Sequence, residues 1–400
     1  MAITPVMRVA YVHPFTQQLS GPDESLLALL APLSRLNVRA HLVVPRATPL
    51  ANRYRALGVT LHQQPLTILH RGMKPGETAL FGPRLVMRAA RLARLLRDID
   101  ADLVHTNMEV VLEGALAARM VGLPHVLHYR GNSLDSPRLL FDVLTLVWAS
   151  LSDRVFCISD ATAQIFRVRK RDRNVAVLYN PIPVRAFAET VRSEAVRASL
   201  GAAPDQPLVI TMGRIHPRKD IETFVRACGL VAAAMPQARF AVVGTAETPV
   251  ELTYHAQVLK LVDQLGVGGR LLFVGARSDV AAVMKAADVF VLASRHEGFG
   301  RVVAEAMAAG TAVVATREGA LPELIDEPRF GLGAVPDDAG DFARQILSLL
   351  GDDQLRLATG RAAADRARDF DAATLAQRVR ECYDELLDGR GETRRNAPIQ

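Results

Sequence analysis

The sequence predicts an α/β protein made of two doubly wound domains, each with a parallel sheet covered by helices on both faces. Three observations support this fold class. The chain has 400 residues, more than one ordinary core organises. Half of its residues are hydrophobic but only 5% are aromatic, which suits helices packed on a sheet. Short apolar runs alternate with amphipathic helical patterns, and this alternation occurs twice.

Strands and helices alternate through the first half of the chain. The predicted buried strands are "RVAYV", "RAHLVV", "DLVHT", "HVLHY", "RVFCIS" and "VAVLYN". Between them, "DESLLALLAPLSRL" and "PRLVMRAARLARLLRDI" have the spacing of amphipathic helices. We assign residues 1–185 to this domain, because Pro181 and Pro183 end its last strand.

The second half repeats the pattern. Its predicted strands are "LVITMG", "FAVVG", "LLFVG", "VFVLAS", "AVVAT" and "GLGAV". We assign residues 186–206 to a linker and residues 207–370 to the second domain. Residues 371–400 should form a C-terminal helix that packs back toward the first domain, followed by a disordered polar tail. Because parallel sheets bind ligands beyond the carboxyl ends of their strands, two facing domains would enclose a site in a cleft.

Composition narrows the class of protein. Cys157, Cys228 and Cys382 lie far apart without metal-ligand spacing, which favours a reduced, intracellular setting. No secretory leader or membrane-spanning run is apparent, so we expect a soluble, cytoplasmic protein. The net charge of +6 fits nucleic acid, anionic lipid or a phosphorylated small molecule as partner. The absence of any nucleic-acid-binding signature in the sequence favours the last two.

The run "VFVLASRHEGFGRVVAEAMAAG" contains a strand, a turn and a helix in succession. Gly298 and Gly300 allow a tight turn and a close approach to a ligand, and the helix begins near Arg301. The first amide groups of a helix have no partner within it and carry the positive end of its dipole. This arrangement is typical of a phosphate site.

Glu305 is the one charge in the otherwise apolar helix "VVAEAMAAG". It could simply complement the helix dipole. A helix that is apolar on all sides is usually buried, however, and a buried carboxylate without a partner is costly. A ligand that donates hydroxyl groups to Glu305 would remove that cost. We favour this interpretation because of the adjoining glycines.

A second strand-and-loop motif is "VITMGRIHPRKD". The strand ends at Gly213, and the following loop carries two cations, Arg214 and Lys219. A leaving diphosphate gains negative charge as its bond to carbon breaks, and fixed cations stabilise that charge. Two basic loop residues are usually plain surface. Their place at a strand end, in the same half as the first motif, favours a diphosphate site.

These residues resemble the donor-binding half of the retaining glycosyltransferases of family 4. The resemblance rests on "GRIHPRKDIETFVRA" and "HEGFGRVVAEAMAAGTAVVATREGALPELI", and extends more weakly to "DLVHTN", "CISDATAQIF" and "VLYNPIP". Members of that family have the GT-B architecture, in which two Rossmann-like domains face each other across a cleft. The resemblance implies an acceptor-binding first domain and a second domain that binds a nucleotide-sugar donor.

The resemblance also implies roles for individual residues. Arg214 and Lys219 would hold the diphosphate, Glu297 would bind hydroxyls of the donor sugar, and Glu305 would take the ribose hydroxyls. His128, at a strand end in "VLHYRGN", would face the reacting sugar. The remaining implied donor contacts are Gly21, Gly213, Gly298, Phe299, Gly300, Arg301 and Val302.

The chain departs from the family pattern at three places. Ser20-Gly21-Pro22 stands where paired glycines are usual, Asp220 replaces the common glycine after the lysine, and "REGALPE" has one glycine instead of two. None of these changes removes a charged donor contact. His128 also has a structural alternative, because a strand-end histidine is often part of the core.

The implied reaction moves a hexosyl or related sugar from a nucleoside-diphosphate donor to an acceptor hydroxyl, with retention of configuration. The acceptor would be a glycan or a lipid-linked molecule, as in cell-surface polysaccharide or glycolipid synthesis. The leaving diphosphate could take the acceptor's proton, so the protein would need to supply only positioning and charge for catalysis. A covalent glycosyl intermediate on Glu297 is the minor alternative. We expect no cofactor and no metal, because Arg214 and Lys219 balance the charge and the Asp-x-Asp runs of "RDIDADL" read as a solvated loop.

The helix "PRLVMRAARLARLLRDI" suggests a membrane contact. Its apolar stripe and the flanking cations are Leu85, Ala89, Leu92, Leu96 and Ile99, and Arg84, Arg88 and Arg91. Most such helices pack on their sheet, and a few bind anionic lipid. This helix and the nearby "HRGMKPGETALFG" are where we expect contact with the inner face of a membrane.

Two other functions stay open. A nucleotide-sugar epimerase of the same architecture would need acid and base side chains in the cleft, and its pattern is not recognisable here. A non-catalytic nucleotide-sugar binding protein would keep the donor site without acceptor chemistry. The presence of Arg214, Lys219, Glu297 and Glu305 together argues against it.

Overall fold

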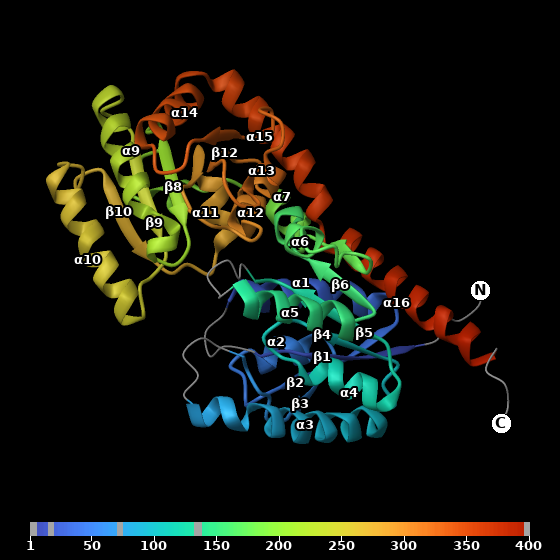
Figure 1. Ribbon diagram of the computed structural model, residues 1–400. Coiled ribbons are helices and arrows are strands. Elements are labelled where there is room, and N and C mark those ends of the chain that lie inside the picture. Colours follow the sequence, from blue (N-terminus) through green and yellow to red (C-terminus); the bar gives the residue numbers. More distant parts are fainter. Residues whose placement is uncertain (1–5, 15–19, 70–74, 132–137, 396–400) are drawn as a thin grey trace, which may run out of the picture. The chain divides into compact units, whose positions relative to one another are not determined.

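The computed structural model describes residues 6–14, 20–69, 75–131 and 138–395. The chain divides into two compact units, each of which is described separately below (Figure 1). The N-terminal unit combines the chain up to Pro181 with the C-terminal segment from Ala372. The C-terminal unit is the continuous segment Ile182–Asp371.

The N-terminal unit is built on a parallel sheet of seven strands in the order β3-β2-β1-β4-β5-β6-β7. The strands are β1 (Met7–Val12), β2 (Val38–Val44), β3 (Thr60–Gln63), β4 (Leu103–Thr106), β5 (His125–Tyr129), β6 (Arg154–Cys157) and β7 (Val175–Val177). β1 pairs with β2 on one side and with β4 on the other. The strand order reverses between β1 and β4, which is where such sheets bind ligands.

Helices cover both faces of this sheet. They are α1 (Gly21–Arg35), α2 (Ala51–Ala56), α3 (Pro75–Asp98), α4 (Glu113–Val121), α5 (Arg138–Leu151), α6 (Asp160–Arg167) and α16 (Ala372–Arg395). α1 begins at a capping box, in which the side chains of Ser20 and Asp23 satisfy each other's backbone amides. α16 returns from the end of the chain, and its Leu375, Val379 and Tyr383 complete the core formed by β1 and α1.

The C-terminal unit has a parallel sheet of six strands in the order β10-β9-β8-β11-β12-β13. The strands are β8 (Leu208–Met212), β9 (Arg239–Val243), β10 (Leu271–Gly275), β11 (Val289–Leu292), β12 (Ala312–Thr316) and β13 (Leu332–Ala334). β8 pairs with both β9 and β11, so the strand order again reverses beside the first strand of the sheet. Each unit therefore has the doubly wound order of a Rossmann-like domain, and the predicted fold class is confirmed.

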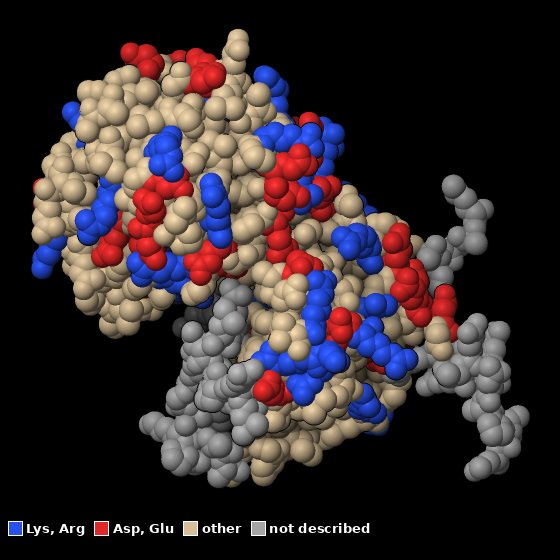
Figure 2. All heavy atoms as spheres, turned by 45° about the horizontal axis from the view of Figure 1, so that its top comes forward, with Lys and Arg blue, Asp and Glu red and all other residues tan. Residues whose placement is uncertain are grey.

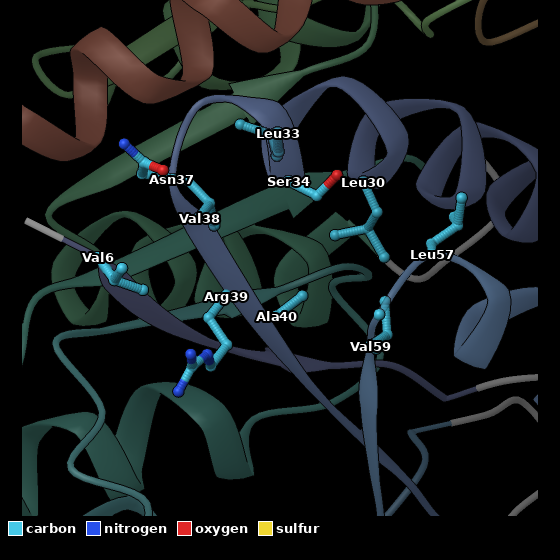
Figure 3. Close-up of a pocket in the computed structure, with 11 residues that line it drawn as sticks. Val6, Leu30, Leu33, Ser34, Asn37, Val38, Arg39, Ala40, Leu57 and Val59 are labelled. Atoms are coloured by element: carbon cyan, nitrogen blue, oxygen red, sulfur yellow. The ribbon is translucent and has the colours of Figure 1, made fainter. Parts of the chain in front are cut away.

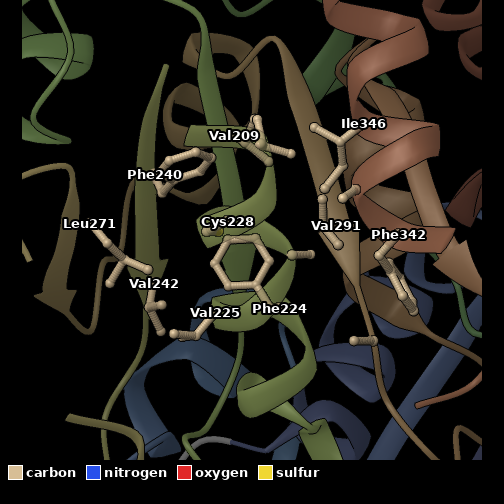
Figure 4. Packing of buried hydrophobic residues seen from close by; sticks show 14 of the residues in the cluster. Val209, Phe224, Val225, Cys228, Phe240, Val242, Leu271, Val291, Phe342 and Ile346 are labelled. Atoms are coloured by element: carbon tan, nitrogen blue, oxygen red, sulfur yellow. The ribbon is translucent and has the colours of Figure 1, made fainter. Parts of the chain in front are cut away.

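The helices of the C-terminal unit pack on the two faces of its sheet. They are α7 (Val184–Ala188), α8 (Glu194–Ser199), α9 (Ile221–Ala234), α10 (Pro249–Gln264), α11 (Val280–Ala286), α12 (Arg301–Ala308), α13 (Leu321–Leu324), α14 (Ala339–Gly351) and α15 (Asp353–Ala367), with 3-10 turns at Pro217–Lys219 and Arg368–Phe370. Figure 4 shows Phe224 of α9 and Phe342 of α14 packed against the sheet. Burying side chains of this size contributes about 1.5–3 kcal/mol each.

The structure differs from the expected domain limits in two segments. Residues 186–206, predicted to be a linker, group with the C-terminal unit and contain α8. Arg197 of α8 is buried, and its guanidinium lies 3.2 Å from the carboxylate of Asp288. α16 runs to Arg395, into the tail predicted to be disordered, and residues 396–400 lie outside the described residues. In the described part of the chain, no helix is long and apolar enough to cross a membrane.

Candidate functional site

Two loops of the C-terminal unit meet where its strand order reverses. One follows β8 and contains Arg214 and Lys219, and the other follows β11 and contains Glu297. The backbone amide of Arg295 donates to the carbonyl oxygen of Arg218 at 3.0 Å, which joins the two loops directly. The carboxyl ends of adjacent parallel strands lie at one edge of a sheet, so this is the expected place for a ligand.

Lys219 and Glu297 meet across these loops. The Nζ of Lys219 donates to Oε1 of Glu297, and both side chains are largely shielded, at 19% and 15% exposure. Each charge therefore has a partner on the other loop. The pair brings together the cation predicted to bind diphosphate and the carboxylate predicted to bind sugar hydroxyls.

Arg214 is held by a residue that the sequence analysis did not single out. Its Nη1 lies 3.1 Å from Oε1 of Glu251, in the first turn of α10. The carboxylate of Glu251 is buried, and its other oxygen accepts from the backbone amides of Glu247 and Thr248 at 3.1 Å. Burial raises the pKa of Glu251, but those amides and the charge of Arg214 outweigh it and hold the pKa below its usual value.

The signal for part of this arrangement is present in the sequence. Thr248 and Glu251 form a capping box at the start of α10, a pattern recognisable as Thr-x-x-Glu. The pattern predicts the helix start. It does not predict that the same carboxylate reaches Arg214, because that contact depends on how β8 and β9 are paired in the sheet.

Glycines allow the backbone to pack closely behind these loops. Gly213 has φ 144° and Gly244 has φ 147°, and a Cβ on Gly244 would overlap the carbonyl oxygen of Gly213. The ends of β8 and β9 can therefore approach only because residue 244 has no side chain.

Glu305 has a partner within its own helix, whereas the sequence favoured a ligand as its partner. Nε of Arg301 lies 2.8 Å from Oε1 of Glu305, one helical turn away, and the two side chains are 14% and 10% exposed. The expectation of a buried carboxylate without a partner in the chain is therefore wrong. The predicted contact between Glu305 and ribose stays a prediction, and the ribose would share this carboxylate with Arg301.

The start of α12 matches the predicted turn. Gly300 caps the helix in a left-handed conformation, with φ 88°, and as the cap residue it has no side chain to offer the first amides. A Cβ at this position would overlap Cδ2 of Leu321, so the turn requires glycine. Gly298 and Val302 are half-buried beside it. Phe299 instead points into the unit, edge-on to Phe370 with ring centroids 5.4 Å apart.

The backbone of Glu297 rests on the loop after β12. The amide of Ala320 donates to the carbonyl oxygen of Glu297 at 3.0 Å. Gly319 has φ 64°, and a Cβ there would lie 2.6 Å from the same oxygen. Ala320 has φ −88°, which alanine adopts without strain. The single glycine of "REGALPE" therefore stands where this contact requires one.

The structure also explains why Asp220 can replace the glycine that the family usually has at this position. Asp220 is left-handed, with φ 47° and ψ 52°, a conformation that aspartate tolerates better than most residues. Its side chain caps α9 by accepting from the amide of Thr223 at 3.4 Å and from the hydroxyl of Thr223 at 2.7 Å. It also lies 3.4 Å from Arg295 of the β11 loop. The aspartate thus keeps a glycine-like backbone and adds a cap.

In the N-terminal unit, Gly21 is the exposed first residue of α1. Behind it, Oδ1 of Asp23 lies 2.8 Å from Nε2 of His13, at the end of β1. Burial raises the pKa of Asp23, and its contacts with His13 and Ser20 outweigh this and lower the pKa. Nδ1 of His13 in turn lies 3.0 Å from the side-chain Nδ2 of Asn107, which follows β4. These contacts span the reversal point of this sheet.

His128 lies in β5 with its ring fully buried. It stacks on His105, with ring centroids 5.6 Å apart, and within the described residues its Nε2 has no hydrogen-bond partner. Burial, followed by the charge of Arg130, lowers its pKa well below the usual value, so the ring is neutral. The prediction that His128 contacts substrate stays a prediction; its surroundings are those of a core histidine.

Arg130, two residues beyond His128, was not predicted as a site residue. Its Nη2 donates to Oδ1 of Asn107 at 2.9 Å and its Nη1 donates to Oδ1 of Asn180. Its backbone amide donates to Oε2 of Glu109 at 3.0 Å. The residues in this cluster follow β4, β5 and β7, so they meet at the carboxyl edge of the sheet. Their positions directly after predicted strands were the available signal.

Two other features of the described residues lie apart from these loops. A shallow groove on the N-terminal unit is lined by Leu33, Val38, Ala40 and Val59, among others (Figure 3). It lies at the amino ends of β2 and β3, the edge away from the ligand-binding ends.

Among the described residues, no group of three or more His, Cys, Asp or Glu side chains is placed to hold a metal ion. Asp102 of "RDIDADL" accepts from the amide of Arg8 at 2.7 Å.

Comparisons with known proteins match both units. Residues 20–185 match the family model described as Glycosyltransferase Family 4, and residues 192–366 match Glycosyl transferases group 1. The chain is 33% identical over 216 residues to the D-inositol 3-phosphate glycosyltransferase of Corynebacterium efficiens, covering 52% of this chain and 48% of that protein. It is 23% identical over 308 residues to an Escherichia coli UDP-Gal:alpha-D-GlcNAc-diphosphoundecaprenol alpha-1,3-galactosyltransferase, covering 74% and 78%.

The chain spans about half the length of the first curated relatives it matches, 48% and 56%. Among solved structures, Anabaena HepE in complex with UDP has a TM-score of 0.79 at 22% identity, covering 95% of this chain and 100% of that one. At this identity the likeness shows the fold alone. The two family models match adjoining halves that together make up most of the chain, in the order of the two units. The chain therefore belongs to the family 4 glycosyltransferases of GT-B architecture.

Proposed function

We propose that this protein transfers a hexosyl or related sugar from a nucleoside-diphosphate donor to an acceptor hydroxyl, with retention of configuration and without a metal ion. The observation that carries the proposal is the contact between Lys219 and Glu297. It joins a fixed cation to a carboxylate at the reversal point of the C-terminal sheet, beside the amino end of α12.

Each charged group has a role in this reaction. Arg214 and Lys219 bind the diphosphate and stabilise the charge that develops on it as the glycosidic bond breaks. The amides of Gly300, Arg301 and Val302 add the positive end of the α12 dipole. On donor binding, Lys219 shifts part of its interaction from Glu297 to phosphate, which leaves the Glu297 carboxylate to accept from sugar hydroxyls. Glu305 accepts from the ribose.

Retention follows if the acceptor attacks from the face that the diphosphate leaves. The departing phosphate oxygen then takes the acceptor's proton, and the cations hold the diphosphate in place while it does so. The protein supplies position and charge, and no metal is needed to neutralise the diphosphate. In this proposal Gly21 lies near the phosphates and His128 lies near the reacting sugar.

We propose a glycan or lipid-linked acceptor, in cell-surface polysaccharide or glycolipid synthesis. One relative is described as acting on a diphosphoundecaprenol-linked sugar and another as acting in lipopolysaccharide core biosynthesis. An acceptor of that kind is presented at a membrane, so the protein would work in the cytoplasm at the inner membrane face. UDP is the first donor nucleotide to test, because the HepE structure contains it.

The test is a set of incubations with UDP-, GDP- and ADP-sugars, each with and without a lipid-linked or glycan acceptor. The proposal predicts transfer with one nucleotide, retained anomeric configuration in the product by NMR, and undiminished rate in EDTA. Conversion of the sugar without acceptor would indicate an epimerase instead. Nucleotide binding with no turnover of any acceptor would favour a binding protein, and loss of activity in EDTA would contradict metal independence.

A further inference from the structure

The inner face of α3 packs into the hydrophobic core of the N-terminal unit. Leu85, Ala89, Leu92 and Leu96 are at most 9% exposed. Leu92 and Leu96 pack with residues of β1, β2 and α4. The apolar stripe read from the sequence therefore faces the sheet and cannot contact a membrane. Arg88 is also turned inward, and its Nη1 donates to the carbonyl oxygen of Leu66 at 2.7 Å.

The opposite face of α3 is unusual because apolar and cationic side chains are exposed together. Leu80, Val86 and Met87 are 47%, 55% and 48% exposed. The outer α3 face consists of these three residues with the exposed cations Arg84, Arg91, Arg94 and Arg97. Figure 1 shows α3 along the outside of the N-terminal unit, and no other helix or strand of that unit is drawn on its far side.

Helical spacing aligns these residues. Leu80, Arg84, Met87, Arg91 and Arg94 recur at intervals of four and three, so they form one stripe along the axis. Val86 and Arg97 are exposed on a second line of the helix, about 100° around its axis from this stripe, and lie three turns apart. No acidic residue occurs between Leu80 and Arg97. The result is a basic surface with one apolar side chain before its first arginine and two between its first and second arginines.

The four outer arginines carry positive charge that the described part of the chain does not neutralise. Within the described residues, no carboxylate lies within ion-pair distance of Arg84, Arg91, Arg94 or Arg97. Some other exposed arginines do have such partners: Arg53 pairs with Glu24 at 2.8 Å and Arg295 with Asp337 at 2.8 Å. On the displayed face of the C-terminal unit, positive and negative side chains lie next to one another (Figure 2). The positive charge of the outer α3 face is thus left for an external anion.

We propose that the outer α3 face docks on an anionic lipid surface. Its arginines would contact lipid phosphates, and Leu80, Val86 and Met87 would insert among the acyl chains at the headgroup boundary. Charge alone would also suit an acidic polymer. The exposed apolar side chains between the arginines favour lipid, because a solvated polymer offers them nothing to bury against. This inference adds to the proposed function the surface by which the protein would bind the membrane that holds its acceptor. It can be tested without donor or acceptor.

The experiment is sedimentation of the full chain with phosphatidylcholine vesicles that contain or lack 30% phosphatidylglycerol, in about 0.1 M and 0.5 M NaCl. We expect binding only to the anionic vesicles, weakened by the higher salt. Each arginine near a lipid surface contributes about fivefold in affinity, so the Arg84→Ala/Arg91→Ala/Arg94→Ala variant should bind about a hundredfold more weakly. Leu80→Ser/Met87→Ser should also weaken binding, at unchanged charge.

The matched control is Arg35→Ala/Arg226→Ala/Arg361→Ala, which removes the same charge from three exposed arginines on α1, α9 and α15. It should bind within about twofold of the wild type. Thermal unfolding checks that every variant folds.

Equal binding by the α3 arginine variant and its control would overturn the proposal, as would no binding of the wild type to anionic vesicles. Binding to soluble polyglutamate that is unchanged by Leu80→Ser/Met87→Ser would assign the face to an acidic polymer. Vesicle binding without sugar transfer would support this inference and contradict the proposed reaction.

Discussion

Oε1 of the buried Glu251 lies 3.1 Å from Nη1 of Arg214, so a carboxylate of α10 sets the position of a cation on the β8 loop. The guanidinium itself is open to solvent, at 58% side-chain exposure. It is therefore free to receive a phosphate while one of its nitrogens stays anchored. An anchored cation stabilises developing charge without having to reorganise first.

Glu251→Gln should lower transfer activity about tenfold, because Gln keeps a hydrogen-bond acceptor for the α10 cap but removes the charge that anchors Arg214. The matched control is Asp341→Asn: Asp341 is also a buried carboxylate in the first turn of a helix, α14, and its Oδ2 accepts from the backbone amide of Val335 at 2.9 Å. It pairs with Arg344, outside the two loops. Steady-state kinetics should show the loss only in the Glu251 variant. Equal losses of activity in the two variants would show that Glu251 acts only as a helix cap.

The Arg301–Glu305 pair predicts a measurable coupling. Both side chains are mostly buried, so removing either one leaves a charge with much of its solvation lost. Glu305→Ala and Arg301→Ala should each destabilise the folded state by about 3 kcal/mol. The double variant should lose much less than the sum, as judged by urea unfolding in a double-mutant cycle. Additive losses would show that the pair does not interact.

Gly300 should be intolerant of a side chain for two separable reasons. In Gly300→Ala, the left-handed backbone should destabilise the folded state by about 1–2 kcal/mol. The overlap of the new Cβ with Leu321 should destabilise it by about 1–3 kcal/mol more. Gly58→Ala is the control, since Gly58 has φ 75° and nothing lies within 4 Å of its added Cβ. Unfolding free energies should therefore fall further for Gly300→Ala. Identical losses would mean that Leu321 moves aside without cost.

Three buried histidines predict a loss of stability at mildly acidic pH. Burial lowers the pKa of His125 to about 3 and puts the pKa values of His105 and His128 well below 6.5. Below pH 6.5 the unfolded chain therefore binds protons that the folded chain does not, and stability falls as the pH falls. From pH 7.5 to 5.5 the loss should be about 4 kcal/mol for three such groups.

The His128→Gln variant checks this assignment. It should reduce the fall by about 1.4 kcal/mol, because one buried group no longer titrates. The measurement is the free energy of unfolding across that pH range. An unchanged slope in the variant would show that the His128 ring takes up its proton in the folded state.

The strands that sequence could predict were the apolar ones. β8, β11 and β12 are continuous runs of buried residues, and β9 is buried after its first residue; such runs in parallel sheets need no alternation. β3 was missed because "TLHQ" is short and polar and lies at the edge of its sheet. The extension of α16 to Arg395 was missed because its last residues are charged and rich in glycine.

The site was predictable where a glycine or a charge follows a strand. Such residues fall at the carboxyl edge of the sheet, which is why Arg214, Lys219 and Glu297 could be grouped. Their partners could not be predicted, because they depend on rotamers and on strand pairing. Sequence alone left Glu305 without a partner, although Arg301 stood four residues before it. It also could not show that Phe299 turns inward toward Phe370.

The central claim is that the β8 and β11 loops form a diphosphate-sugar site. Calorimetric titration of UDP, GDP and ADP into the wild type and into Arg214→Ala/Lys219→Ala tests it most directly, with Arg218→Ala, an exposed cation of the same loop, as control. The account predicts that one nucleotide binds the wild type, that the double variant loses at least about a hundredfold in affinity, equivalent to about 2.7 kcal/mol, and that the control changes less than twofold. Unchanged affinity in the double variant would contradict it.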